Sequence, residues 1–302
     1  MNFLPEFGAE PSFACKLCGG LAKPLMGHNG FSIVRCGACG FMFALVPKEY
    51  DLGAVYADDA YWNGGCNYGY PDYEQAWRDA RQLLLLRLKR LEHLTRPGRM
   101  LEIGCAAGYF LREAHRRGWQ VCGVELSPTM RRRCEDLVGC RVFGSLQEAT
   151  DSALRFDCVA MFEVIEHLDE PLRFMRQVRS VMTPRAILVL STPNFIAPEA
   201  FGNPQSNHWF CPPAHVSYFT PDTLRDCVEQ AGFEAIQIVG VLEGEEMPLP
   251  DALARALAPF RKGRRLRPGG LIGKLIKIWQ RRRRDVLMWA NSLELYARNP
   301  AG

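Results

Sequence analysis

The 302-residue chain lacks any apolar run near the roughly 18 residues that a membrane-spanning helix requires. Its first ten residues contain two glutamates and no Lys or Arg, so they do not predict a secretory signal. Internal repeats are absent, which argues against a solenoid. With 48% hydrophobic and 23% charged residues, the composition excludes a disordered or collagen-like chain and predicts a folded protein.

Acidic residues are missing from 261–284, a stretch that contains eleven Lys or Arg. Elsewhere acidic residues outnumber basic ones, so the net charge of +4 does not indicate a nucleic-acid-binding core. Apolar residues recur in this stretch at the spacing of a basic amphipathic helix: Leu271, Ile272, Leu275, Ile276 and Trp279. We favour a lid packed on its own domain, ahead of contact with an anionic membrane, and contact with RNA last.

Twelve cysteines are too few for a disulfide scaffold in a chain of this length, and they indicate thiols in a reducing cytoplasm. Four of them form two Cys-x2-Cys pairs, Cys15 with Cys18 and Cys36 with Cys39, separated by 17 residues. That spacing is typical of two turns that hold one Zn²⁺. Four thiolates leave no position for water, so the pattern predicts a structural zinc in a small ribbon-like module.

Strand and helix signals alternate from Gly98 onward, which predicts an α/β fold with a parallel sheet covered by helices on both faces. Seven strands are expected, at 99–105, 120–126, 141–145, 156–162, 185–191, 233–241 and 292–298. The chain divides into three parts: the ribbon-like module at 11–45, a helical cap at 50–96, and the α/β domain at 97–302 with the basic insertion at 250–285.

The first of these strands runs into a turn of small residues, Gly104-Cys-Ala-Ala-Gly108, that opens a helix. Small residues there let a ligand lie against the backbone at the helix N-terminus. A dinucleotide fingerprint would require glycine at 106 and 109, where Ala106 and Tyr109 stand, and no Gly-Lys-Ser/Thr follows for a Walker loop. Glu125 ends the next strand, at a position where a carboxylate can hold a ribose diol. The small-residue turn and Glu125 together therefore predict a nucleoside site.

A second group of polar residues, Glu163-x2-Glu166-His167, follows the strand at 156–162. The carboxyl ends of strands are where open α/β sheets place their chemistry, and a helical turn there would put the three side chains on one face. His167 could act as a general base, since a neutral imidazole accepts a proton near neutral pH. Alternatively, His167 donates to the backbone and Glu166 is a solvated helix residue.

Taken together, these segments resemble class I S-adenosylmethionine-dependent methyltransferases. Leu101 to Gly108 is similar to the first motif of that family, with Ala106 in place of the commoner glycine, and Phe162 to Leu168 is similar to the segment after the fourth strand. The segment Pro212 to Pro221, followed by Ala231-Gly-Phe233, resembles ubiquinone-pathway O-methyltransferases and sugar methyltransferases. The resemblance implies a Rossmann-like seven-stranded methyltransferase sheet behind the N-terminal zinc-ribbon-like module.

The resemblance also implies roles for single residues. Cofactor contacts would come from Glu102, Gly104, Ala106 and Gly108 beside the methionine part, Glu125 and Leu126 at the ribose, Ser145 and Leu146 near the adenine, and Phe162 and Glu163 closing the pocket. Metal-dependent relatives with the same Glu-x2-Glu-His pattern suggest a Mg²⁺ site made of Glu163, Glu166, His167 and His215. An aromatic cluster covers the sulfonium or packs the helical cap: Tyr61, Trp62, Tyr68, Tyr70 and Tyr73.

The sequence thus predicts methyl transfer from S-adenosylmethionine to a small-molecule acceptor or one linked to a lipid or sugar, with oxygen as the attacked atom and His167, Glu163 and His215 as catalytic residues. The basic stretch 261–284 would allow peripheral contact with the inner face of a membrane. Two alternatives stay open. One is an RNA methyltransferase, which the acidic balance of the core disfavours, and the other is a non-catalytic zinc-containing scaffold.

Overall fold

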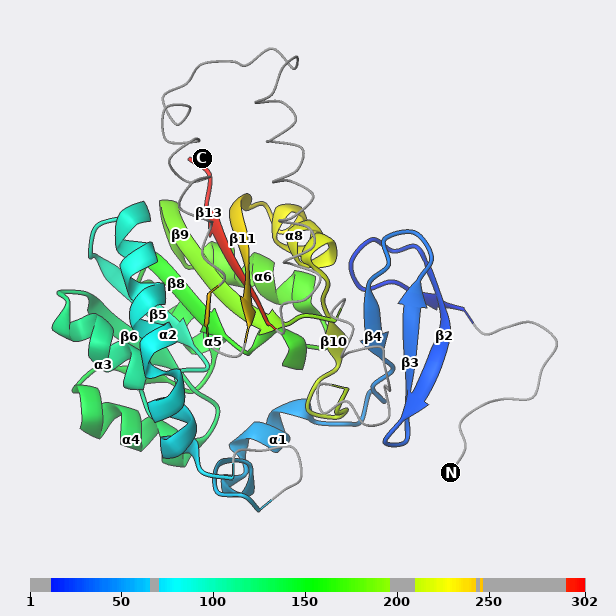
Figure 1. Ribbon diagram of the computed structural model, residues 1–302, viewed down its shortest axis with the longest axis horizontal. Helices are drawn as coiled ribbons and strands as arrows, with labels where there is room; N and C mark the ends of the chain where they lie inside the picture. Colours follow the sequence, from blue (N-terminus) through cyan, green and yellow to red (C-terminus); the bar gives the residue numbers. More distant parts are fainter. Residues whose placement is uncertain (1–11, 66–70, 196–209, 243–244, 247–291, 302) are drawn as a thin grey trace, which may run out of the picture.

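The computed structural model describes residues 12–65, 71–195, 210–242, 245–246 and 292–301, and its largest feature is a mixed sheet (Figure 1). In spatial order the strands are β12 (Glu245–Glu246), β11 (Glu234–Leu242), β13 (Ser292–Arg298), β9 (Met182–Pro193), β8 (Phe156–Phe162), β5 (Arg99–Ile103), β6 (Gln120–Val124) and β7 (Val142–Phe143). From β9 to β7 neighbouring strands are parallel, whereas β13 runs antiparallel between β9 and β11. All seven predicted strands are confirmed, and the two-residue β12 extends the edge.

Helices cover both faces of this sheet, as the alternating pattern predicts. Their bounds are α2 (Tyr73–Leu94), α3 (Tyr109–Arg116), α4 (Pro128–Val138), α5 (Leu146–Asp151), α6 (Pro171–Ser180) and α8 (Pro221–Gln230). The buried side chains of α2, α3 and α4 pack in one core cluster, and those of α5, α6 and α8 pack in another on the opposite face. The start of α8 is determined by neighbouring residues, because Thr220 and Thr223 form a reciprocal capping box.

The N-terminal module is a second sheet that lies beside the large one (Figure 1). Its strands in spatial order are β1 (Phe13–Ala14), β2 (Leu21–His28), β3 (Phe31–Cys36), β4 (Met42–Ala44) and β10 (Ser217–Tyr218). The fifth strand is contributed by the α/β domain, because β10 belongs to the connection between β9 and α8. After the module come α1 (Leu52–Ala57) and the 3-10 helix η1 (Asp59–Trp62).

The two sheets also share a hydrophobic core. Phe41 and Phe43 of the module belong to the same buried cluster as Phe219, which follows β10. The rings of Phe41 and Phe219 lie 5.1 Å apart between centroids, and neither side chain is exposed. At the rim of this contact, Lys16 of the module pairs with Asp169 of the α/β domain.

Two sequence predictions concern segments outside the described residues: the basic insertion at 250–285, including the amphipathic stretch 261–284, and Tyr68 and Tyr70 of the aromatic cluster. Within the described part of the chain, no helix combines the length and apolarity needed to cross a bilayer.

We expect Phe219→Ala to lower the free energy of unfolding by about 3–5 kcal/mol, because it leaves a cavity where the module meets the domain. Leu21→Ala is the matched control, since Leu21 of β2 is 67% exposed, and we expect it to change stability by less than about 0.5 kcal/mol. Urea denaturation of both variants measures the difference. Equal stabilities would show that the shared core contributes nothing.

Candidate functional site

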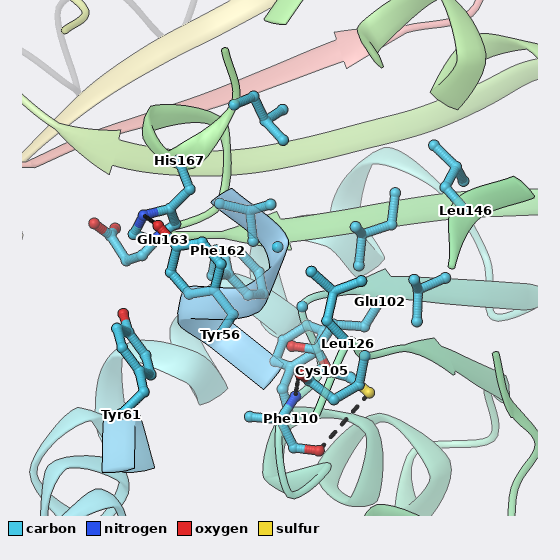
Figure 2. A pocket seen from close by; sticks show the side chains of 18 of the residues that line it. Tyr56, Tyr61, Glu102, Cys105, Phe110, Leu126, Leu146, Phe162, Glu163 and His167 are labelled. Carbon is cyan, nitrogen blue, oxygen red and sulfur yellow. Dashed lines mark hydrogen bonds between the residues drawn. The ribbon is translucent and has the colours of Figure 1, made fainter. Parts of the chain in front are cut away.

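A cavity of about 670 Å³ opens at the carboxyl ends of β5, β6 and β8, under α1, η1 and the first turns of α2 (Figure 2). The predicted site residues that line it are Glu102, Gly104, Ala106, Glu125, Leu126, Ser145, Leu146, Phe162, Glu163 and His167. Gly108, Glu166 and His215 do not line it, although each lies close to residues that do. Most of the remaining wall is aromatic or aliphatic, including Tyr61, Trp62, Tyr73, Trp77 and Leu84.

The turn after β5 depends on left-handed backbone. Gly104 has φ +72°, and a Cβ there would lie 2.7 Å from a methyl of Val164. Gly108 caps the N-terminus of α3 at φ +80°, where a Cβ would meet the sulfur of Cys134 at 2.4 Å. Ala106 also has a positive φ, +45°, which explains why glycine is the commoner residue at this place in the motif.

Glu125 is held in place by the turn it faces. One carboxylate oxygen accepts a hydrogen bond from the amide of Ala106 at 2.9 Å, and the other accepts from the amide of Ser127 at 2.8 Å. Burial raises the pKa of Glu125, while these amides act in the opposite direction. Each oxygen has a second lone pair, so the carboxylate can still accept from a pair of hydroxyl groups in the cavity.

Glu102 reaches the cavity from the end of β5 and has one buried oxygen, Oε2, without a hydrogen-bond partner. Burial raises its pKa well above the usual range, the nearby carboxylate of Glu125 adds to the shift, and Arg87 of α2 opposes it. A buried acceptor without a partner is unfavourable unless a ligand supplies a donor. The ammonium of a bound amino-acid group suits this position.

The segment after β8 differs from the helical turn that the sequence suggested. Glu163 stands in left-handed backbone, φ +53°, and its carboxylate accepts from the hydroxyl of Ser191 at 2.7 Å. The 3-10 helix η2 (Ile165–His167) begins only after it, so no α-helical turn runs from Glu163 to His167. The carboxyl of Glu163 nevertheless adjoins that of Glu166. A full α-helical turn would require right-handed φ at Glu163.

His167 lies half-buried at the opposite end of the cavity from Glu102, next to Tyr56 of α1 (Figure 2). Its Nδ1 is 2.8 Å from the carbonyl oxygen of Ala214 and 2.8 Å from the hydroxyl oxygen of Tyr56. Burial lowers the pKa of His167 to about 4, and the carbonyls of Ala214 and Glu163 oppose the shift. The imidazole is therefore neutral at physiological pH and able to accept a proton or bind a metal.

Glu166, His167 and His215 form a cluster whose candidate ligand atoms all lie within 4.8 Å of one another. The side chain of Glu166 is fully buried. Its Oε2 accepts from Thr192 at 3.0 Å, and Oε1 has no partner. Of the four predicted Mg²⁺ ligands, three come together, while Glu163 is not part of the group. The burial of Glu166 excludes the interpretation that it is a solvated helix residue.

The four cysteines meet at the base of the N-terminal module. Sγ of Cys15 lies 3.6 Å from that of Cys39, and Sγ of Cys18 lies 3.5 Å from that of Cys36. Four thiolates around one zinc at about 2.3 Å would be about 3.8 Å apart, close to these distances. The amides of Leu17 and Gly20 each donate to a cysteine sulfur at 3.4 Å.

Other predicted residues have mainly structural contacts. Ser145 caps α5, with its hydroxyl accepting from the amide of Glu148 at 3.2 Å, and Leu146 beside it is buried in the cavity wall. Phe162 packs edge-on against Phe110, and the guanidinium of Arg87 lies 4.3 Å from its ring centroid.

Tyr56 and Arg87 are among the cavity residues that were not identified from the sequence. Tyr56 belongs to a six-residue helix without a motif, and Arg87 falls among the other basic residues of α2. Arg87 is only 6% exposed and forms a 2.7 Å ion pair with Glu294 of β13. No pattern near either residue marks its role, because the hydrogen bond of Tyr56 to Ala214 and the ion pair of Arg87 with Glu294 join segments far apart in the chain.

Comparison with known proteins identifies the family of the chain. Residues 73–238, more than half of the chain, match the family described as "Methyltransferase domain". The ubiquinone biosynthesis O-methyltransferase of Cereibacter sphaeroides is 28% identical over 156 residues, which cover 48% of this chain and 63% of that protein. The protein of the same name from Azorhizobium caulinodans is 29% identical, with 48% and 62% covered. The matched region spans less than two thirds of these relatives.

Two solved structures show the same fold. A SAM-dependent methyltransferase from Archaeoglobus fulgidus superposes with a TM-score of 0.51 at 22% identity, covering 75% of this chain and 97% of that one. Phosphoethanolamine N-methyltransferase 2 from Haemonchus contortus, solved with S-adenosyl-L-methionine, gives a TM-score of 0.50 at 15% identity, with 86% and 62% covered. The chain belongs to the methyltransferase domain family, within the class I S-adenosylmethionine-dependent methyltransferases.

We expect Glu125→Ala to weaken the binding of S-adenosylhomocysteine by about 100-fold, because two hydrogen bonds from a ribose to a charged group are lost, each contributing about 1.5 kcal/mol or more. Isothermal titration calorimetry measures the affinity. Glu135→Ala is the control, since Glu135 is exposed on α4. Thermal unfolding of the variant measures how much the loss of the hydrogen bonds to Ala106 and Ser127 destabilises the fold. An unchanged affinity would contradict the assignment of Glu125 to the ribose.

Proposed function

We propose that this protein transfers a methyl group from S-adenosylmethionine to a hydroxyl of a small acceptor, with His167 as the general base. The observation that carries the proposal is the division of one cavity into two ends. Glu102 and Leu126 lie at one end, and Tyr56 and His167 lie at the other (Figure 2). A cofactor held by the first end would direct its reactive group toward the second.

The cofactor residues are assigned from position and chemistry. The turn at 104–108 would lie along the methionine part, Glu102 would accept from its ammonium, and Glu125 would accept from the ribose hydroxyls. Leu126, Ser145 and Leu146 would border the adenine. When bound, S-adenosylmethionine supplies a methyl group activated by its positive sulfur, and the aromatic wall around Tyr61 and Trp62 suits that charge.

The reaction follows from the other end of the cavity. A hydroxyl oxygen of the acceptor forms a bond to the methyl carbon as the bond from carbon to sulfur breaks, and the hydroxyl proton passes to His167. The neutral imidazole is in the correct protonation state for this step. The apolar wall excludes water and favours an acceptor with an aromatic or aliphatic body, in keeping with the names of the ubiquinone biosynthesis O-methyltransferase relatives.

A divalent cation is the second candidate for activating the hydroxyl. The unpartnered Oε1 of Glu166, with His167 and His215 within 4.8 Å, is the observation in its favour. This set has two imidazoles and one carboxylate, which is a softer set than Mg²⁺ usually takes. In this arrangement the cation would lower the pKa of the acceptor hydroxyl, and Glu163 would not be a ligand.

We further propose a structural zinc on Cys15, Cys18, Cys36 and Cys39, and the division into 11–45, 50–96 and 97–302. Burial by itself raises the pKa of Cys36, but the amides of Cys39 and Ala38 and neighbouring thiols bring it down to about 7. Burial raises the pKa of Cys15 and Cys39, so the proposal rests on the spacing and the proximity of the four sulfurs. Membrane contact by 261–284 and a lipid- or sugar-linked acceptor stay predictions from the sequence.

We expect His167→Gln to lower the turnover number about 100-fold or more, with little change in the affinity for S-adenosylhomocysteine, because a general base contributes about 10²–10⁴ in rate. Catechol and a hydroxylated sugar serve as acceptor probes, with S-adenosylhomocysteine release as the readout. His115→Gln is the matched control, since His115 is exposed on α3.

The same assay with Mg²⁺, Mn²⁺ or EDTA separates the two mechanisms. Turnover that EDTA abolishes and a metal restores would make His167 and Glu166 metal ligands, whereas turnover indifferent to both supports the general base. If the wild type binds no S-adenosylhomocysteine at all, the proposed function is wrong, and the protein is a zinc-containing scaffold.

Metal analysis tests the zinc proposal. The purified protein should contain about one zinc per chain, because four thiolates complete a tetrahedral site. A Cys15→Ser/Cys18→Ser double variant should lose it, whereas Cys122→Ser, which changes a cysteine outside the cluster, should retain it. Zinc retained by the double variant would contradict the assignment.

A further inference from the structure

The ring of His167 is held by the backbone of a segment from which the sequence analysis identified only the side chain of His215 as part of the site. This segment, residues 211–218, leads from the connection after β9 into β10. The carbonyl oxygen of Ala214 accepts from the Tyr56 hydroxyl at 2.6 Å and lies 2.8 Å from Nδ1 of His167. The Tyr56 hydroxyl and the His167 ring, from two separate parts of the chain, therefore meet at the carbonyl oxygen of Ala214, which belongs to a third.

This geometry selects one tautomer of the neutral imidazole. A carbonyl oxygen can only accept hydrogen bonds, so its short contact with Nδ1 favours the tautomer that carries the proton on Nδ1. The hydroxyl of Tyr56, whose own proton points to Ala214, offers its oxygen as a second acceptor to Nδ1–H at 2.8 Å. The carbonyl of Glu163 also lies near the ring, but Nε2 makes no hydrogen bond to the described residues. Nε2 is then the unprotonated nitrogen of His167, which is the form that a base or a metal ligand needs.

The 211–218 segment is in turn fixed by the N-terminal module. The carbonyl of Val216 accepts from the amide of Ala44, at the end of β4, at 2.8 Å, and the amide of Val216 donates to the carbonyl of Glu166 at 2.9 Å. From there β10 pairs antiparallel with β4. The hydroxyl of Ser217 donates to the carbonyl of Leu168 at 2.7 Å, which ties the segment to the end of η2.

Tyr56 reaches His167 from the same side. Its helix, α1, follows the module directly and is capped by Asp51, whose carboxylate accepts from the amides of Gly53 and Ala54 at 2.9 and 3.3 Å. The ring of Tyr56 packs against that of Tyr61 at 5.2 Å between centroids. Both acceptors for Nδ1–H are therefore placed by the module and the helix that leaves it.

We propose that Tyr56 and the 211–218 segment, which β4 of the N-terminal module holds in place, are positioning elements that fix His167 with its proton on Nδ1. The module is then part of the catalytic apparatus and not only a fold-stabilising addition. The inference rests on the proposed role of His167, either as the base or as a metal ligand, since both require a free Nε2.

The test is a spectrum and a rate measured on the same full-length zinc-replete protein. Long-range ¹H–¹⁵N correlation spectra of histidine-labelled protein at pH 7.5 distinguish the two neutral tautomers, and His167→Gln identifies the signal among the six histidines. We expect the wild type to show Nδ1–H alone. In Tyr56→Phe a second tautomer should appear and the turnover number should fall about 10-fold or more, with the S-adenosylhomocysteine affinity unchanged within about twofold.

Two further variants separate positioning from general stability. Ser217→Ala removes the tie to Leu168, and we expect it to admit the second tautomer as well. Tyr50→Phe is the matched control, because Tyr50 is exposed and lines no part of the cavity. Its spectrum, turnover and affinity should equal those of the wild type.

Three results would overturn the inference: a wild-type His167 with its proton on Nε2, a Tyr56→Phe variant with wild-type spectrum and turnover, or a loss of S-adenosylhomocysteine affinity equal to the loss of rate, which would indicate a merely structural role. If no probe acceptor is methylated by the wild type, the proposed function fails, yet the spectra still decide whether Tyr56 and the 211–218 segment fix the tautomer.

Discussion

The pairing of β4 with β10 is the interaction on which the arrangement of the cavity depends. β10 has only two residues, too few to hold a long connection by themselves, and it is stable because β4 supplies its partner and the Phe41 and Phe219 rings cover it. Through this pairing a sheet formed around four cysteines continues into the backbone that contacts His167. The small sheet thus holds the backbone that contacts His167 at one end of the cavity.

Buried carboxylates characterise both ends of the cavity. Glu102 at one end and Glu166 near the other each have a buried oxygen without a partner, and burial raises the pKa of both. Such groups are costly in an apolar wall unless a donor or a positive charge arrives. An ammonium at Glu102 and a cation or an ordered hydroxyl at Glu166 would satisfy them.

The parts of the structure that the sequence predicted are those set by neighbours in the chain. The strands follow from short apolar runs, the turn at 104–108 follows from small residues between a strand and a helix, and the cysteine cluster follows from spacing alone. Glu125 could be placed because it ends a strand adjacent to β5. In each case the local pattern and the tertiary fold require the same conformation.

The remaining features could not be predicted because contacts between distant segments determine them. Tyr56 becomes part of the site only through Ala214, and β10 becomes a strand only through β4. The left-handed backbone of Glu163 interrupts the expected helical turn, and its carboxylate contacts Ser191 of the neighbouring strand β9. Periodicity gives no signal for a partner more than a hundred residues away in the chain.

The contribution of β10 to the N-terminal sheet has a consequence for the order of folding during synthesis. The ribosome makes β1 to β4 first, but the edge of β4 obtains its partner only after the strands from β5 to β9 have been produced. Until then the nascent module has an open strand edge, the kind of surface that pairs with other chains. The edge of β4 that pairs with β10 therefore stays without this partner while β5 to β9 are made, and a chain that ended before β10 would expose that edge to other chains.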